Sequence, residues 1–186
     1  MSDSPLSRSD AISGRRFRDV LGNFPTSVVA ITTADAERLP HGMVVGTFTS
    51  VSLEPPLVSF LADRSSTTLR TIRSTGRFCA NALAGNQERL SRQMAAGGDR
   101  FEGVGRKAST LGNPVLDGVV AWVDCEVEQV VEIGDHQLVV GHVRDLCVES
   151  HRTPLLFFRG GYGDYLSSAT TLLDRLVGWD AFGRQD

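Results

Sequence analysis

Residues Gly42 to Ile72 read GMVVGTFTSVSLEPPLVSFLADRSSTTLRTI, and the expectations for the rest of the chain build on this stretch. From Val45 to Leu53 the side chains alternate between two unlike sets, and a period of two predicts a strand with two different faces. Glu54-Pro55-Pro56 ends this strand, because proline has no backbone N–H to donate and restricts the residue before it. The short apolar run Leu57–Ala62 predicts a second, buried strand.

A cluster of hydroxyl side chains follows the second predicted strand. Arg64-Ser65-Ser66-Thr67-Thr68 overlaps the start of a segment, Thr67–Ser74, that we expect to be a helix with Gly76 as its terminating residue. Unpaired N–H groups at a helix start, hydroxyl donors and a positive charge together suit a phosphate group. The alternative is a Ser/Thr helix cap after a polar turn, with no ligand at all. Taken alone, these residues leave both interpretations open.

Composition is typical of one soluble globular domain. The chain has 186 residues, of which 41% are hydrophobic and 22% charged, so it can bury a core without disulfides or metals. A net charge of −3 provides no extended positive field, so we expect neither nucleic acid nor an acidic membrane surface as a partner. The chain lacks an apolar leader segment and a run near the roughly 20 apolar residues of a membrane span. We therefore expect a cytoplasmic protein.

Cysteine and histidine usage argues against a metal site. The cysteines are odd in number, far apart and each in a predicted strand: Cys79, Cys125 and Cys147. Without C-x-x-C spacing they predict buried, reduced thiols rather than a disulfide framework or a zinc site. The histidines also lack the spacing of metal ligands: His41, His136, His142 and His151. We expect no metal.

The remaining pattern predicts a mainly β fold. Further strands are expected at 27–33, 77–83, 119–133, 137–149 and 154–159, and short helices at 16–21 and 86–96. The glycine-rich segment 99–118 is expected to be mostly loop, and Gly160–Gly163 a turn. Strands follow strands instead of alternating with helices, which favours a mainly antiparallel barrel with two or three short helices over a doubly wound sheet.

No composition break divides the chain internally. We expect a disordered tail at 1–13, one domain at 14–166 and a C-terminal tail at 167–186. Within that last tail, Leu172, Leu173, Leu176 and Val177 have the spacing of a short amphipathic helix that could contribute to a subunit contact. Common catalytic signatures are missing: there is no G-x-G-x-x-G after a strand, no P-loop, no H-E-x-x-H and no G-x-S-x-G.

The chain resembles the short-chain flavin reductases, the NAD(P)H-dependent reductase components of two-component flavin monooxygenases. GMVVGTFTSVSLEPPLVSFLADRSSTTLRTI is similar to the flavin-binding signature of that family. Four further pieces match in the same order: FPTSVVAITT, GRFCANAL, GDRFEGV, and GDHQLVVGHV followed by PLLFFRGGYG. The resemblance spans about Phe17 to Tyr165.

The resemblance implies an antiparallel split β-barrel of the flavin reductase type and a set of site residues. Those bordering the isoalloxazine and ribityl chain would be Val45, Gly46, Thr47, Phe48, Ser50 and Val51. The phosphate loop would be Ser65, Ser66, Thr67 and Thr68, and the segment that closes over the flavin would contain Arg100 and Phe101. The nicotinamide side would hold His136, the one candidate catalytic residue, and Tyr162. Relatives often carry Asn where this chain has Gly46, so backbone is expected to replace a side-chain contact there.

The implied activity is hydride transfer from NADH (or NADPH) to FMN (or FAD). Reduced flavin would then pass to a separate monooxygenase, and the reductase would be a homodimer. This activity agrees with the missing nucleophile motifs, because the flavin itself accepts the hydride and the protein has only to bind and orient. We expect His136 to position the dinucleotide instead of acting as an obligatory base.

Three alternatives remain. The chain could be a non-catalytic flavin-binding or electron-carrier protein on the same barrel, or a flavoenzyme like pyridoxamine-phosphate oxidase, whose barrel is related. It could also be an interaction subunit whose flavin site has decayed.

Overall fold

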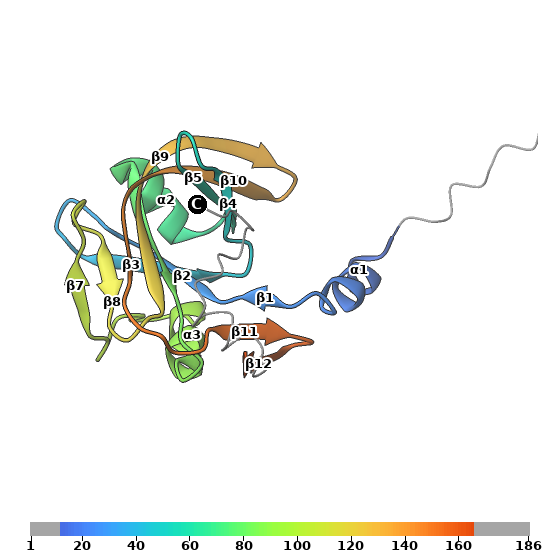
Figure 1. Cartoon of the computed structure of the whole chain (residues 1–186). Helices are drawn as coiled ribbons and strands as arrows, with labels where there is room; N and C mark the ends of the chain where they lie inside the picture. Colours follow the sequence, from blue (N-terminus) through green and yellow to red (C-terminus); the bar gives the residue numbers. More distant parts are fainter. Residues whose placement is uncertain (1–11, 166–186) are drawn as a thin grey trace, which may run out of the picture.

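Three antiparallel sheets and three helices make up residues 12–165, the part of the chain that the computed structural model describes (Figure 1). The helices are α1 (Gly14–Leu21), α2 (Thr67–Thr75) and α3 (Glu88–Ala95). The strands are β1 (Thr26–Ser27), β2 (Val29–Ala34), β3 (Pro40–Val45), β4 (Thr49–Ser52), β5 (Leu57–Asp63), β6 (Arg77–Ala82), β7 (Arg106–Ala108), β8 (Pro114–Leu116), β9 (Ala121–Ile133), β10 (His136–Val148), β11 (Leu155–Phe158) and β12 (Gly161–Asp164). The predicted mainly β, antiparallel architecture is confirmed.

The main sheet has seven strands in the order β3-β2-β6-β9-β10-β5-β4. It curls so that its two edge strands, β3 and β4, are joined by only three residues, Gly46 to Phe48. The Thr47 hydroxyl spans this gap: it accepts a hydrogen bond from the Leu61 N–H at 2.9 Å and lies 3.3 Å from the Leu61 carbonyl as a donor. A single strand from Val45 to Leu53 was therefore the wrong expectation, because closing the barrel breaks the chain into β3 and β4.

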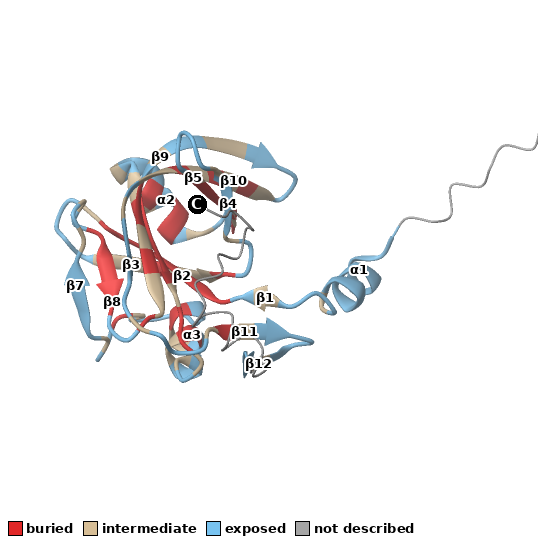
Figure 2. Ribbon diagram, viewed as in Figure 1, coloured by how far each residue is buried: buried red, intermediate tan, exposed pale blue. Residues whose placement is uncertain are grey.

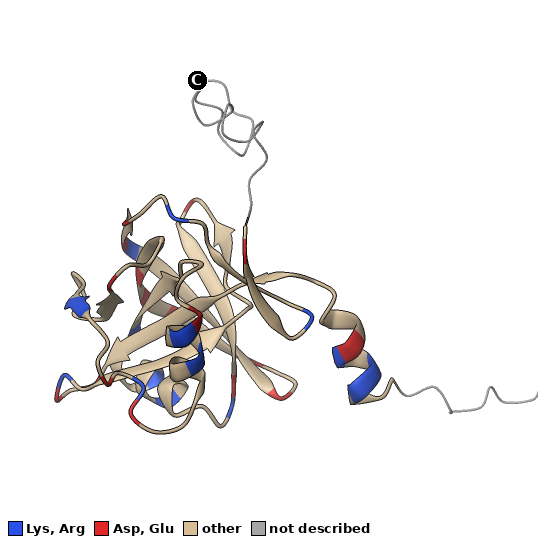
Figure 3. Cartoon of the chain, turned by 90° about the horizontal axis from the view of Figure 1, so that it is seen from below, with Lys and Arg blue, Asp and Glu red and all other residues tan. Residues whose placement is uncertain are grey.

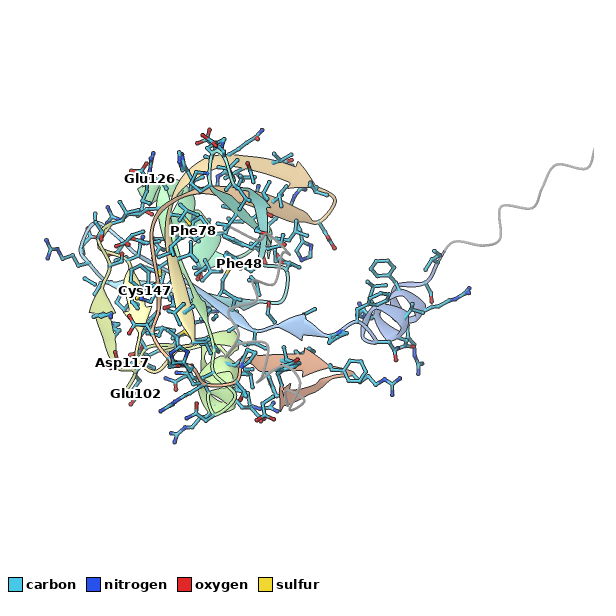
Figure 4. All side chains as sticks on the ribbon, viewed as in Figure 1. Phe48, Phe78, Glu102, Asp117, Glu126 and Cys147 are labelled. Atoms are coloured by element: carbon cyan, nitrogen blue, oxygen red, sulfur yellow. The ribbon has the colours of Figure 1, made fainter. Side chains whose placement is uncertain are left out.

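Two apolar clusters lie on opposite faces of the sheet. Figure 2 marks in red the buried positions along the ribbon, among them those of β2 and α2. One fills the barrel under α2, and its Phe60 and Phe78 rings meet edge to face at 5.1 Å. Phe48 packs against this cluster (Figure 4). The other lies under α3 and includes Met94 and Phe101. Together they hold α2 and α3 on the two sides of the edge strand β3.

Helix α2 begins and ends where local signals predict. The Ser66 hydroxyl accepts a hydrogen bond from the Leu69 N–H at 3.2 Å, which caps the first turn. Gly76 follows the last turn with φ of +69°, a left-handed conformation that favours glycine. The expected helix and its glycine stop are confirmed.

Cys79 and Cys125 are buried free thiols, as predicted. Burial raises the pKa of the Cys125 thiol to about 12 and raises that of Cys79 as well, so both stay protonated. Cys147 is exposed, and the expectation that it is buried was wrong. Strand β10 runs on past its last pairing with β5, at His142, so Cys147 has a neighbouring strand on one side only.

Two other segments differ from expectation. Residues 99–118 contain the two-stranded ribbon β7–β8, and the predicted turn at Gly160–Gly163 includes most of β12, which pairs with β11. The tail at 1–11 and the possible helix around Leu172–Val177 lie outside the described residues. Within residues 12–165, no helix is long and apolar enough to cross a membrane.

Candidate functional site

Two neighbouring pockets along the edge strand β3 collect most of the predicted site residues. The first, here the His136 pocket, has a volume of about 550 Å³. Its predicted residues come from three separate parts of the chain: Val45, Gly46, Thr47, Ser66 and His136. The second, here the Arg100 pocket, has a volume of about 350 Å³ and holds Thr67, Thr68, Arg100 and Phe101 beside Pro40–Gly42. β3 thus carries one pocket at each end.

Gly42, in the middle of β3, fixes the elements around the Arg100 pocket. Its carbonyl accepts hydrogen bonds from the Thr68 hydroxyl at 2.9 Å and from Arg100 Nη1 at 2.6 Å. On its other side a Cβ would lie only 3.0 Å from the Phe101 ring and 3.1 Å from Met94 Sδ. Glycine therefore lets α2, Arg100 and the Phe101 ring all pack closely against one strand.

The same geometry orients the rest of the β3 edge. Because the Gly42 carbonyl points away from β2, and antiparallel pairing alternates with a period of two, Val44 turns its backbone groups in the same direction. Val44 and Gly46 both line the His136 pocket. An edge strand offers unpaired N–H and C=O groups in fixed positions, so this pocket has a wall of regularly spaced backbone donors and acceptors.

The four consecutive hydroxyls have different partners. Ser65 donates to Asp63 Oδ1 at 2.6 Å, Ser66 caps α2, and Thr68 donates to Gly42. Among residues 12–165, the Thr67 hydroxyl and the N–H groups of Thr67 and Thr68 have no hydrogen-bond acceptor. Exposed Thr67 and the anchored Arg100 cation thus face one pocket at the positive end of a helix, an arrangement suited to an anion.

His136 begins β10 and is held by an acidic neighbour. Its Nδ1 lies 2.6 Å from Asp135 Oδ1, and this hydrogen bond, with the charge of the ring, lowers the pKa of Asp135. Asp63 is the residue opposite His136 in the β5–β10 ladder. Hydrogen bonds from Ser65 lower the pKa of Asp63, and His136 contributes a smaller electrostatic effect. Both carboxylates are therefore ionised at neutral pH, and Asp135 fixes the orientation of the His136 ring.

Tyr162 lies in a third pocket. This pocket, of about 200 Å³, shares Val44, Val45 and Gly46 with the His136 pocket and also contains Thr26. The Tyr162 hydroxyl accepts a hydrogen bond from Ser91 at 3.0 Å, and its ring meets Phe157 edge to face. His136 and Tyr162 thus line different pockets, and the segment from Val44 to Gly46 lines both.

Three of the predicted flavin-bordering residues lie outside these pockets. Phe48 packs against the barrel core, while Ser50 and Val51 are exposed on β4. Phe101 is buried against Gly42 and forms a wall of the Arg100 pocket, so its ring is part of the core. Their contact with a ligand remains a prediction.

The sequence interpretation missed some pocket residues: Thr26, Met43, Asp63 and Asp135. Asp135 directly precedes His136, and Asp63 lies two positions before Ser65. A carboxylate next to a histidine could have been recognised from the sequence, because it can orient the ring. Nothing local identifies Thr26, which comes to the site through the β2–β3 and β1–β11 pairings.

Residues 21–165 match the model of the flavin reductase like domain family. The chain belongs to this family. It is 49% identical over 156 residues to a flavin reductase of Pseudomonas putida, an alignment that covers 83% of this chain and 92% of the relative. It is 41% identical to the reductase subunit HsaB of a flavin-dependent monooxygenase from Rhodococcus jostii, covering 83% of this chain and 79% of that one.

Solved structures agree with the sequence relatives. Component B of nitrilotriacetate monooxygenase from Mycobacterium thermoresistibile superposes with a TM-score of 0.79 at 40% identity, over 82% of this chain and 86% of that one. The NADH:FAD oxidoreductase SgcE6 of Streptomyces globisporus was solved in complex with NAD and FAD fragments. It superposes with a TM-score of 0.79 at 28% identity, over 87% of this chain and 99% of that one. The predicted split-barrel fold and the predicted flavin reductase activity are confirmed, so this flavin reductase uses a flavin and a nicotinamide dinucleotide.

Gly46 of this flavin reductase provides a test of how the pockets are divided. A Cβ at Gly46 would lie 2.7 Å from Thr26 Oγ1 and 3.2 Å from Thr26 Cβ, so Thr26 occupies the space of the missing side chain. Gly46→Ala is expected to lower the free energy of unfolding by about 1–3 kcal/mol through overpacking. In a Thr26→Ala background the same change is expected to cost little, which makes the interaction energy of the pair about 0.5–3 kcal/mol.

Urea unfolding of the four proteins of this double-mutant cycle measures the interaction energy. Gly97→Ala serves as the control, because a Cβ there meets nothing within 4 Å. An equal cost of Gly46→Ala in both backgrounds would show that Thr26 does not fill this space.

Proposed function

We propose that this flavin reductase binds its flavin along the β3 edge. The ring system occupies the His136 pocket and the ribityl phosphate reaches the Arg100 pocket. The observation that carries this proposal is the adjacency of the two pockets along β3, one with an edge of backbone donors and acceptors and the other with a fixed cation. A volume of about 550 Å³ lies within the usual range of about 300–1,000 Å³ for small-molecule sites.

Each pocket has the chemistry that its half of the flavin requires. In the Arg100 pocket the cation, the Thr67 hydroxyl and two free N–H groups would hold the phosphate. In the His136 pocket the outward backbone groups of Val44 and Gly46 would bind the polar edge of the ring, and Met43 and Leu61 would contact its apolar part. The bound flavin accepts the hydride, so the protein needs no nucleophile.

We propose NADH as the hydride donor, with NADPH as the alternative. Asp63 and Asp135 are ionised beside it, and among the described residues no Lys or Arg lines the His136 pocket. The nearby Arg64 is paired with Glu132 at 2.8 Å. The described residues of this pocket therefore offer no cation that would select a dinucleotide with a 2′-phosphate. FMN or FAD would serve as acceptor.

Reduced flavin would pass to a separate monooxygenase, as in the two-component systems to which several relatives belong. The pockets are open to solvent and no described element forms a lid over them, so a flavin that enters and leaves as a substrate suits this site. We propose a cytoplasmic location, where NADH and the partner oxygenase would be available.

His136 is expected to act on the nicotinamide and not on the flavin. Purified enzyme should oxidise NADH, followed at 340 nm, only when FMN or FAD is added. His136→Ala should raise the KM for NADH at least fivefold and leave the KM for flavin within twofold, because we place the flavin ring against the β3 backbone and the nicotinamide beside His136. His142→Ala, a change on the same strand outside the three pockets, is the control. Equal increases in both KM values would make His136 a structural residue.

Thr67 is the hydroxyl expected to contact the phosphate. Thr67→Ala should raise the KM for FMN about fivefold, the loss of one hydrogen bond worth about 1 kcal/mol, while thermal stability and the KM for NADH stay unchanged. Ser74→Ala, at the other end of α2, is the matched control. If flavin affinity is unaffected, the four hydroxyls have only structural roles: they cap α2 and hold it against the barrel.

We also propose a homodimer in which α1 packs on the partner subunit. In the single chain α1 stands apart from the barrel and buries none of its residues (Figure 1). Its Phe17 is 56% and its Val20 53% exposed, on a helix whose other positions are largely charged. A small helix with its apolar side in water is unstable alone, so a second surface is required.

Sedimentation equilibrium tests the dimer. The wild-type protein is expected to be dimeric at micromolar concentration, and Phe17→Ser should raise the dimer dissociation constant at least tenfold through lost apolar burial. Arg15→Ser, on the charged side of α1, should have little effect. A wild-type monomer, or a dimer indifferent to Phe17→Ser, would refute this role of α1.

A further inference from the structure

A basic hollow lies next to the Arg100 pocket, on the side away from His136. Its volume is about 480 Å³, and it lies between the tip of the β2–β3 hairpin, the start of β6 and the β7–β8 ribbon (Figure 1). Four cationic side chains line it: Arg38, Arg77, Arg106 and Lys107. No carboxylate among the described residues lines it.

The charge of this hollow is largely uncompensated. Lys107 is paired with Glu149, but within residues 12–165 none of the three arginines has an ion-pair partner. Arg77 Nε is buried and has no hydrogen-bond acceptor. Elsewhere on the protein, acidic and basic positions are interspersed (Figure 3). In a chain of net charge −3, a concave site with three unpaired guanidinium groups suits an anionic ligand.

The hollow is continuous with the flavin phosphate position proposed above. Pro40 lines both the hollow and the Arg100 pocket. The Arg106 guanidinium lies 5.4 Å from the centre of the Phe101 ring, which is a wall of the Arg100 pocket. One guanidinium–ring contact therefore separates the two spaces, and a chain of phosphates that leaves Arg100 would meet the arginines of the hollow next.

We propose that this basic hollow binds the adenosine monophosphate half of FAD and makes FAD the preferred flavin over FMN. This inference rests on the proposed placement of the ribityl phosphate in the Arg100 pocket. Arg38 and Arg106 bind the second phosphate, and the hollow takes the adenosine. A second route from the Arg100 pocket leads past His41 to a hollow lined by Arg70 and Arg77. Asp35 and Glu37 line that space as well and offset the two arginines, so it attracts a phosphate less than the basic hollow does.

The test compares FAD with FMN on the full-length protein. Dissociation constants are measured by quenching of flavin fluorescence for wild type, Arg38→Gln/Arg106→Gln, Arg70→Gln and Arg89→Gln. Glutamine keeps the aliphatic stem and removes only the charge. The double variant is expected to weaken FAD binding at least tenfold and to leave FMN binding within twofold. Arg70→Gln in the second hollow, and Arg89→Gln, exposed on α3, are expected to change neither.

Several results would overturn the proposal. Equal affinity of the wild type for FAD and FMN would mean that the adenosine half contributes nothing. A parallel loss of FAD and FMN binding in the double variant would mean that these arginines support the flavin site in general. A loss of FAD binding in Arg70→Gln alone would place the adenosine in the other hollow.

Competition by AMP gives a second readout. AMP is expected to inhibit FAD-dependent NADH oxidation competitively with FAD and to leave FMN-dependent oxidation unchanged. Inhibition in both assays would assign the hollow to the dinucleotide donor and overturn the proposal. A wild-type protein that binds neither flavin would instead count against the proposed flavin site itself, so the two failures are distinguishable.

Discussion

The hydrogen bonds to the Gly42 carbonyl organise the site more than any other contact. β3 is an edge strand, and an edge strand carries backbone groups that no neighbouring strand satisfies. Leaving such a group buried without a partner costs about 1–3 kcal/mol. Here Thr68 and Arg100 satisfy the Gly42 carbonyl from two different elements, so one backbone atom ties α2 and the loop after α3 to the same strand. At the next outward-facing position, Val44, no described residue occupies the backbone groups, so they can bind a ligand.

The two interpretations of the hydroxyl cluster turn out to apply to different residues. Ser66 is a helix cap, and Thr68 belongs to the Gly42 contact, so both serve the fold. Ser65 holds Asp63, which stands opposite His136. Of these four residues, Thr67 alone has a hydroxyl without a partner among residues 12–165, and it lies beside a cation that Gly42 already holds in place. Structure and binding are therefore divided residue by residue within four consecutive positions.

The features that could be predicted from the sequence are those that depend on contacts between residues close together in the chain. Ser66 and Gly76 set the ends of α2 within a few residues of chain, and the alternation in β9 and β10 is a property of each strand alone. The break at Gly46–Phe48 depends instead on Leu61, which the Thr47 hydroxyl reaches only once the barrel has closed. Cys147 is exposed because the pairing of β10 with β5 stops at His142, and Thr26 enters a pocket because β2 pairs with β3 and β1 with β11. These facts concern distant strands, so no window of sequence contains them.

The distribution of charge in space is the other property that could not be predicted from the sequence. A net charge of −3 is an average over a chain in which acidic and basic groups are sorted along one strand edge. Asp63 and Asp135 lie at the His136 end of β3, Arg100 beside its middle, and Arg38 and Arg106 beyond its start. These residues are far apart in the chain, and only the barrel brings them into this order. A ligand lying along the edge would meet an acidic end, a single cation and then a basic hollow, so its least charged part is favoured near His136 and its phosphates toward the hairpin tip. This gradient would orient a flavin nucleotide before any contact with its ring, and it follows from the position of β3 at the open edge of the sheet.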